Sequence, residues 1–110
     1  MAFLTPIRVV QGISPRGFLG RMRAYGPDRI SCTPHTFFRL SQGQRKVHTC
    51  EALKERLLGS PPVFAGIQEN GCTAAFYKLE GNSFMRVILS LQPKEAQVVT
   101  FYIVTGVPQV

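Results

Sequence analysis

Residues 63–104, VFAGIQENGCTAAFYKLEGNSFMRVILSLQPKEAQVVTFYIV, decide the fold that we expect for this chain. They contain four apolar segments of strand length, rich in β-branched and aromatic residues: Val63 to Gln68, Thr73 to Leu79, Phe84 to Leu91 and Gln97 to Val104. The links between them are short and rich in turn formers, so they can join antiparallel neighbours but cannot cross over between parallel ones. The sequence therefore predicts an antiparallel β-meander of four strands.

The period of two along each strand predicts which side chains share a face of this sheet. The wholly apolar sets are expected in the core: Val99, Phe101 and Ile103, with Met85, Val87, Leu89 and Leu91. The opposite face then carries Arg86, Ser90, Thr100 and Tyr102, and Tyr77 joins them if the register allows. Such a polar face is compatible with a phosphate pocket and equally with an ordinary solvent-exposed surface.

Two helices are expected ahead of the sheet. Thr33 and Pro34 suit the N-cap and first position of one helix, which would place His35 and Arg39 one turn apart on the same face. The second is expected at residues 49–58, between a threonine cap and a glycine stop. The predicted fold class is α+β, with two N-terminal helices packed on a four-stranded antiparallel β-meander. An ordinary solvated face is the alternative interpretation of the His35 and Arg39 pair.

Basic residues concentrate in the first half of the chain. Thirteen Lys and Arg face six Asp and Glu, which gives a formal net charge of +7. Residues 1–48 hold eight of the basic residues and one acid, whereas the remaining five basic residues are balanced by five acids. This pattern favours a polyanionic partner. We interpret residues 1–29 as a basic, loop-rich arm with one helical turn around Phe18 to Met22, or alternatively as a solvated connector, and residues 30–110 as the folded domain.

The cysteines and the apolar segments indicate where the protein acts. Cys32, Cys50 and Cys72 form no C-x-x-C pair and lack zinc-site spacing, so we interpret them as reduced thiols in a cytoplasmic protein. The N-terminal residues lack a secretion-signal pattern, and no segment has the roughly 18 apolar residues of a membrane span. The acidic residues are scattered, so we expect no metal, no cofactor and no membrane contact. A Cys–His nucleophile is conceivable, but buried thiols are the commoner case.

The order of these parts resembles that of a known ribonuclease group. Its elements are an H-x-x-x-R helix at His35 and Arg39, an E-A-L-x-x-x-L helix from Glu51 to Leu57, and a meander ending in Val99-Thr100-Phe101-Tyr102. This order resembles the superfamily of barnase, EndoU, colicin and RelE-like ribonucleases, in particular its small toxin domains. The resemblance covers about residues 30–104 and consists of element order and residue type, without a long signature string.

The resemblance implies a catalytic site made of His35, Arg39, Arg86, Thr100 and Tyr102. Metal-independent RNA cleavage requires a base for the ribose 2′-hydroxyl, an acid for the leaving oxygen and cations for the phosphate. Histidine is the side chain whose unperturbed pKa lies nearest neutrality, which makes His35 the first choice for acid or base. The two arginines suit the phosphate, and the hydroxyl groups suit its positioning or protonation. The expected product is a 2′,3′-cyclic phosphate.

RNA binding and the expected partners follow from the same basic half. The residues expected to bind RNA are Arg21, Arg23, Arg45, Lys46 and His48, and the last three are also alternative sources of acid–base groups. The expected partners are RNA (tRNA, rRNA or mRNA) and an acidic antitoxin or immunity protein. The alternative function is a non-catalytic basic nucleic-acid-binding module. A toxin that acts on a protein and a structural accessory protein are further alternatives.

Overall fold

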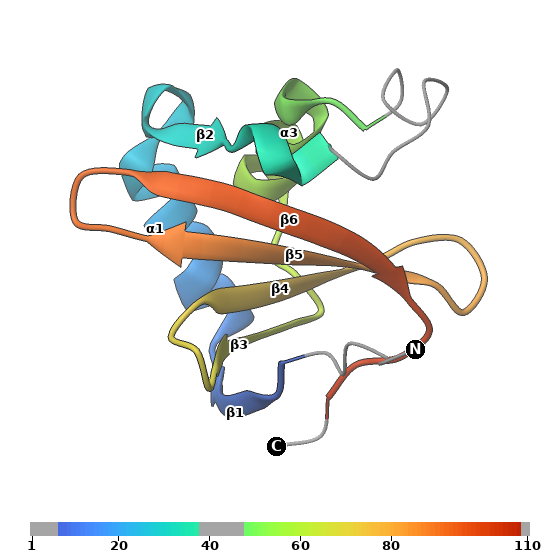
Figure 1. The fold of residues 1–110 in the computed structure, drawn as a ribbon. Helices are drawn as coiled ribbons and strands as arrows, with labels where there is room; N and C mark the ends of the chain where they lie inside the picture. The colour runs from blue at the N-terminus through green and yellow to red at the C-terminus, as the bar shows by residue number, and fades with distance from the viewer. Residues whose placement is uncertain (1–6, 38–47, 109–110) are drawn as a thin grey trace.

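The structure, a computed structural model, describes residues 7–37 and 48–108 (Figure 1). Within these ranges, two α-helices and two short 3₁₀ helices lie among the first two strands, and four further strands follow. In chain order the elements are β1 (Val9–Ile13), α1 (Pro15–Tyr25), η1 (Pro27–Arg29), β2 (Ile30–Cys32), η2 (Pro34–Phe37), α3 (Cys50–Gly59), β3 (Phe64–Gln68), β4 (Thr73–Lys78), β5 (Phe84–Leu91) and β6 (Ala96–Val104).

The strands form one mixed sheet of six strands in the order β1-β3-β4-β5-β6-β2. The four segments predicted as strands form β3 to β6, which are consecutive antiparallel neighbours. The predicted fold is nevertheless wrong, because β1 extends the sheet beyond β3 and β2 pairs in parallel with β6. Both added strands are short, with five and three residues, and neither is among the four strands predicted for the sheet.

Helix α1 occupies the segment expected to be a loop-rich arm. The Ser14 side chain caps its start by accepting a hydrogen bond from the Gly17 N–H, and Pro15 fills the first position. Phe18, Met22 and Tyr25 are buried at helical spacing, so the face that they share packs into the core. Burial of this apolar face stabilises the helix despite the two glycines that it contains.

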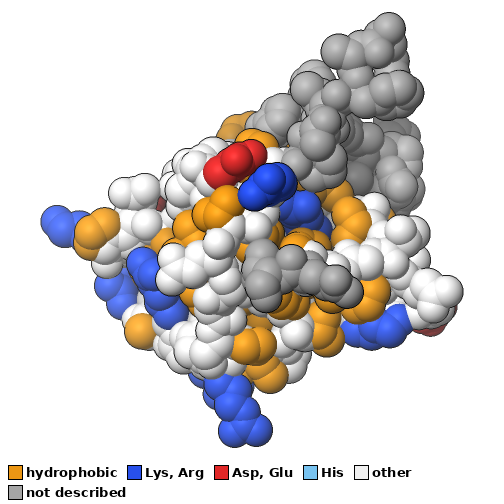
Figure 2. Space-filling model, turned by 90° about the horizontal axis from the view of Figure 1, so that it is seen from below, with side chains coloured by type: hydrophobic (Ala, Val, Ile, Leu, Met, Phe, Trp, Pro, Cys, Tyr) orange, Lys and Arg blue, Asp and Glu red, His pale blue; other side chains and the backbone are white. Residues whose placement is uncertain are grey.

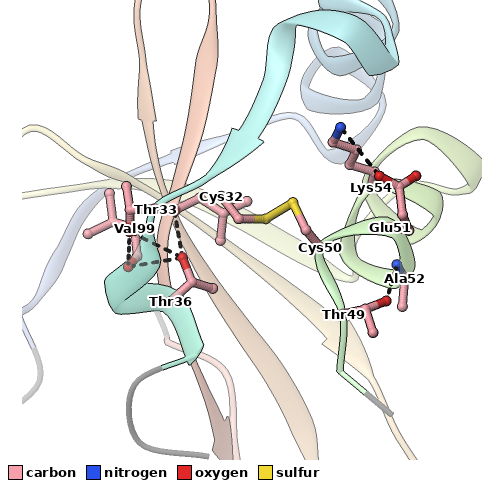
Figure 3. The surroundings of a disulfide bond; sticks show 10 residues. Cys32, Thr33, Thr36, Thr49, Cys50, Glu51, Ala52, Lys54 and Val99 are labelled. Carbon is pink, nitrogen blue, oxygen red and sulfur yellow. Dashed lines mark hydrogen bonds and ion pairs between the residues drawn. A yellow bond between two sulfur atoms is a disulfide. The ribbon is translucent and has the colours of Figure 1, made fainter. Parts of the chain in front are cut away.

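The helix predicted to start at Thr33 is a short 3₁₀ helix, η2, in the described part of the chain. The Thr33 hydroxyl does not cap a helix but donates to the Val99 carbonyl at 3.2 Å, and its N–H donates to the Val98 carbonyl at 3.0 Å. The Thr36 hydroxyl, which is buried, also donates to the Val98 carbonyl, at 2.8 Å. These bonds fix η2 on β6 immediately after the parallel pairing with β2 ends (Figure 3).

The main core lies between the sheet and the helices α1 and α3, which cover one face (Figure 1). Met85, Val87, Leu89 and Phe101 face this core, as predicted. Three other predictions are wrong: Tyr77 faces the helices, Val99 packs with the cluster on the opposite face, and Ile103 is 53% exposed. A bulge explains Val99, because Ile88 pairs with Thr100 while Leu89 pairs with Val98, which leaves Val99 unpaired between them.

A disulfide between Cys32 and Cys50 joins the end of β2 to the start of α3, with 5.9 Å between the two Cα atoms (Figure 3). The prediction of three reduced thiols is therefore wrong, and Cys72 alone is a free cysteine in the described part of the chain. None of the described helices combines the length and apolar character of a membrane span.

We predict opposite effects for two Gly→Ala substitutions. A Cβ at Gly66 would lie 2.4 Å from the Val9 Cγ1 atom and 2.8 Å from the Gln11 carbonyl oxygen, so Gly66→Ala should lower the free energy of unfolding by about 1–3 kcal/mol. A Cβ at Gly20, inside α1, meets nothing within 4 Å, so Gly20→Ala should raise it by roughly 0.5–1 kcal/mol. Urea unfolding of both variants measures these changes, and equal effects would contradict the β1–β3 packing.

Reduction of the disulfide should destabilise the protein. The two cysteines are 18 residues apart, and closing a loop of about this length stabilises a fold by about 3 kcal/mol in the chain-entropy model. We expect dithiothreitol to lower the thermal midpoint of the wild type and to leave Cys32→Ser/Cys50→Ser unchanged. An unchanged wild-type midpoint, with all thiols shown to be reduced, would contradict the pairing.

Candidate functional site

The sheet face turned away from the helices contains a cavity of about 230 Å³. Its lining comes from Ile7, from the segment that links β3 to β4, and from the middle of β5 and β6. The side chains in this lining that can form hydrogen bonds are those of Gln68, Asn70, Cys72, Arg86, Thr100 and Tyr102. Three of the five residues predicted to be catalytic, Arg86, Thr100 and Tyr102, therefore line one cavity.

The register of β5 and β6 brings these three side chains together. Arg86 pairs with Tyr102, and Ile88 pairs with Thr100. Because residues two apart on a strand share a face, Thr100 lies on the same face as Arg86 and Tyr102. The prediction that Arg86, Thr100 and Tyr102 share a face is thus confirmed. The bulge lies beyond Thr100, between this pair and the pairing of Leu89 with Val98, and it leaves the shared face intact.

The turn between β3 and β4 supplies the opposite wall. The Asn70 Oδ1 atom accepts from the Cys72 N–H at 3.1 Å and from the Gln68 Nε2 atom at 3.2 Å. The Gln68 side chain is buried, and its Oε1 atom is thereby directed toward Arg86. The local hydrogen bonds of one turn therefore orient the amide that contacts the guanidinium.

Arg86 is the buried cation of this site, with a relative exposure of 8%. Its Nη2 atom donates to the Ile7 carbonyl at 2.6 Å and to the Gln68 Oε1 atom at 2.5 Å. The guanidinium carbon lies 5.2 Å from the centre of the Phe76 ring. The Nε atom is buried and has no hydrogen-bond partner within the described ranges. Arg86 thus keeps donor capacity that the described residues do not use.

No described carboxylate lies within ion-pair distance of Arg86, and the ion pair found in residues 7–37 and 48–108 is Lys54 with Glu51. Burial lowers the pKa of Arg86, and the negative charge of an ionised Tyr102 would raise it in part. A buried charge is costly unless it is paired. The arrangement therefore favours occupation of the cavity by an anion, and a bound anion would oppose the effect of burial on this pKa.

The hydroxyl groups of Tyr102 and Thr100 complete the polar wall. Tyr102 is 37% exposed and Thr100 is half-buried, so both remain within reach of a molecule that enters from solvent. A guanidinium beside two hydroxyl groups and an amide is a set of donors that suits phosphate oxygens. Chemically, this cavity can hold a phosphate group and exchange a proton with it through Tyr102.

His35 and Arg39, the other two predicted catalytic residues, are only in part within the described structure. His35 lies in η2, which Thr33 and Thr36 fix to the Val98 and Val99 carbonyls, directly before Thr100 in the chain. Its backbone is thereby placed beside the part of β6 that leads into the cavity. Arg39, together with Arg45 and Lys46, lies outside the described residues.

The remaining predicted RNA-binding residues lie away from this cavity. Arg21 is exposed on α1. Arg23, also on α1, donates from Nε to the Leu58 carbonyl at 2.9 Å and so binds the C-terminal end of α3. The His48 ring packs against the Phe101 ring at a tilt of 53°, with 5.4 Å between the ring centres, on the helix side of the sheet. Arg23 therefore joins the two helices, whatever its contribution to RNA binding.

Sequence analysis did not identify Gln68 and Asn70 as site residues. The sequence signal in this region is the group of turn formers at residues 69–71. It predicts a hairpin but does not predict that the hairpin contacts Arg86. In the described part of the chain, no three His, Cys, Asp or Glu side chains are grouped so that they could hold a metal ion.

Comparisons with known proteins give no match for this chain, whether against protein-family models, curated proteins or solved structures. The functional argument therefore depends on the site itself.

We predict that inorganic phosphate stabilises the wild type through Arg86. Binding to the folded state alone contributes about 1.4 kcal/mol at ten times the dissociation constant, which is roughly 5 °C for a domain of this size. A phosphate titration at constant ionic strength should therefore raise the thermal midpoint of the wild type and leave that of Arg86→Met unchanged. Lys94→Met removes an exposed cation and serves as the matched control, which should respond as the wild type does. An equal response of Arg86→Met would contradict the site.

Proposed function

We propose that this protein is a metal-independent endoribonuclease toxin that holds the scissile phosphate of RNA in the Arg86 cavity. The observation that carries the proposal is a buried guanidinium, without a carboxylate partner in the described structure, beside two hydroxyl groups in one cavity. Electrostatic stabilisation by groups held in place before the substrate arrives is a major source of catalysis at phosphate. The products would carry 2′,3′-cyclic phosphate ends.

Each residue of the cavity has a proposed role. Arg86 binds the phosphate and stabilises the negative charge that builds up during attack. Tyr102 transfers a proton, and Thr100 positions a phosphate oxygen. His35 is the proposed acid–base partner, which the attachment of η2 to β6 supports, and Arg39 is a second proposed phosphate ligand.

RNA is the proposed substrate because cleavage of this kind needs the 2′-hydroxyl as the attacking group. The net charge of +7 favours a polyanion, and Figure 2 shows many Lys and Arg side chains and few acidic ones on the surface seen from below. We propose that the target is tRNA, rRNA or mRNA in the cytoplasm, and that an acidic antitoxin or immunity protein neutralises the toxin. The disulfide is typical of proteins that pass through an oxidising compartment, which fits a toxin delivered from outside the target cell.

A second candidate function is non-catalytic binding of nucleic acid. One observation favours it: in the part of the chain that the structure describes, neither a histidine nor a carboxylate lines the cavity. Binding requires only the cation and the donors, whereas cleavage also requires proton transfer. The two functions therefore differ in whether Tyr102 and His35 act on the bound phosphate.

Cleavage of total RNA in EDTA tests the proposal. We expect the wild type to leave cyclic phosphate ends, and we expect Tyr102→Phe, Arg86→Lys and His35→Ala each to lower the cleavage rate by about 100-fold or more. Tyr25→Phe removes a hydroxyl that donates to the Gln92 carbonyl, far from the cavity in the sheet, and is the matched control for Tyr102→Phe. Thermal unfolding establishes that each variant is folded at the assay temperature.

Intact RNA with the folded wild type, together with salt-sensitive RNA binding that Arg86→Lys weakens, would replace this proposal by the binding module. Cleavage that survives Tyr102→Phe and Arg86→Lys unchanged would show that the reaction takes place elsewhere on the protein.

A further inference from the structure

A second cationic feature lies on the helix side of the sheet, in a groove of about 760 Å³ between α3 and the β4–β5 hairpin. Three basic side chains from three separate segments line it: His48 before α3, Arg56 on α3 and Lys78 at the end of β4. The lining of the groove also includes Ile103, Leu79 and Ser83. Ile103 pairs with Met85, and Arg56 lies against Tyr77, so this wall of the groove is on the helix side of the sheet. Lys78 pairs with Phe84, and this pair alternates with Tyr77 and Met85, so the Lys78 side chain reaches the groove from the other face, at the end of the β4–β5 hairpin.

Each of the three basic side chains lies against an aromatic ring. The Arg56 guanidinium carbon is 5.9 Å from the centre of the Tyr77 ring, and the Lys78 Nζ atom is 5.1 Å from that of Phe84. The His48 ring packs against the Phe101 ring at a tilt of 53°. Contact with a ring face holds a cation in place without neutralising it, so the charges of Arg56 and Lys78 remain available to a partner.

Carboxylates contribute little to this groove. Glu80 is the acidic residue in its lining, and within the described ranges it forms no ion pair with Arg56 or Lys78. The Lys78 ammonium group donates to the Leu79 and Gly81 carbonyls. These bonds fix its position without neutralising its charge. The groove therefore has an excess of positive charge that the structure holds in place.

We infer that this groove is a second binding site, which takes the phosphate backbone of single-stranded RNA. The cations of the groove complement the negative charge of the phosphates. The Ile103 side chain, which is 53% exposed, offers an apolar surface on which a base can lie. The bases of a duplex are paired and cannot make this contact, so the groove favours a single strand. The choice of RNA rests on the proposed function, whereas the binding of a phosphate backbone rests on the groove alone. The site would hold a second part of the substrate, away from the reacting phosphate.

Binding of a short fluorescent 2′-O-methyl oligouridine, measured by anisotropy at several salt concentrations, tests the inference. This RNA lacks the attacking hydroxyl, so the measurement does not depend on whether the protein cleaves RNA. Each phosphate contact contributes about 0.7 to the slope of log affinity against log salt. We expect Arg56→Gln/Lys78→Gln to lower that slope by about 1.4 and to weaken binding at low salt.

Two variants sharpen the test. Arg16→Gln/Lys94→Gln removes the same charge from exposed positions on α1 and the β5–β6 turn, and it should keep the slope of the wild type. Glu80→Gln removes the acid of the groove and should tighten binding.

The inference fails if the groove variant and the surface control have equal slopes and affinities. It also fails if poly-glutamate binds the wild type as tightly as the RNA does and loses affinity in the groove variant, because the groove would then recognise an acidic protein. Loss of oligouridine binding only in Arg86→Met would assign all RNA contact to the cavity and would leave the cleavage proposal standing without the groove.

Discussion

The positive charge of Arg86 lies in the middle of the sheet, more than nine-tenths buried and without a described carboxylate beside it. Removal of such a charge from water is costly, so the surrounding structure must compensate. The Ile7 carbonyl, the Gln68 side chain and the Phe76 ring do so in part. These contacts also tie the segment before β1 to the central strands. The edge of the sheet and the candidate site therefore depend on the same guanidinium.

The structure has two regions of positive charge, the Arg86 cavity and the groove of Arg56 and Lys78. On one face of the sheet, the Arg86 cavity is small and enclosed by polar donors, which suits a single phosphate group. The groove, between α3 and the β4–β5 hairpin, is larger and has apolar residues in its wall, which suits a stretch of nucleic-acid chain. Both regions keep their charge because their cations are held by carbonyl oxygens and aromatic rings, with no carboxylate paired to them in the described structure. A polyanion with phosphates at several positions could use both.

The sequence predicted those features that follow from local patterns. Alternation along two strands placed Arg86, Thr100 and Tyr102 on one face, and the turn formers placed β3 to β6. The sequence-based prediction failed where pairing with a distant segment determines the structure. Strand β2 has only three residues and forms because β6 offers a free edge. The displacement of Val99 needs the bulge, and the disulfide needs the approach of β2 to α3. The Thr33 hydroxyl suits a helix cap, but here the Val99 carbonyl of β6 accepts its hydrogen bond.

The central claim is that the guanidinium of Arg86 receives the phosphate of RNA. The most direct measurement is the NMR signal of the Arg86 Nε–H group, assigned by comparison with Arg86→Lys, during titration with a 2′-O-methyl dinucleotide. Our account predicts that this signal shifts downfield and becomes protected from exchange with water as the phosphate binds, together with shifts of the Thr100 and Tyr102 amides. An Arg86 signal that stays in place while the dinucleotide shifts other residues would contradict the account.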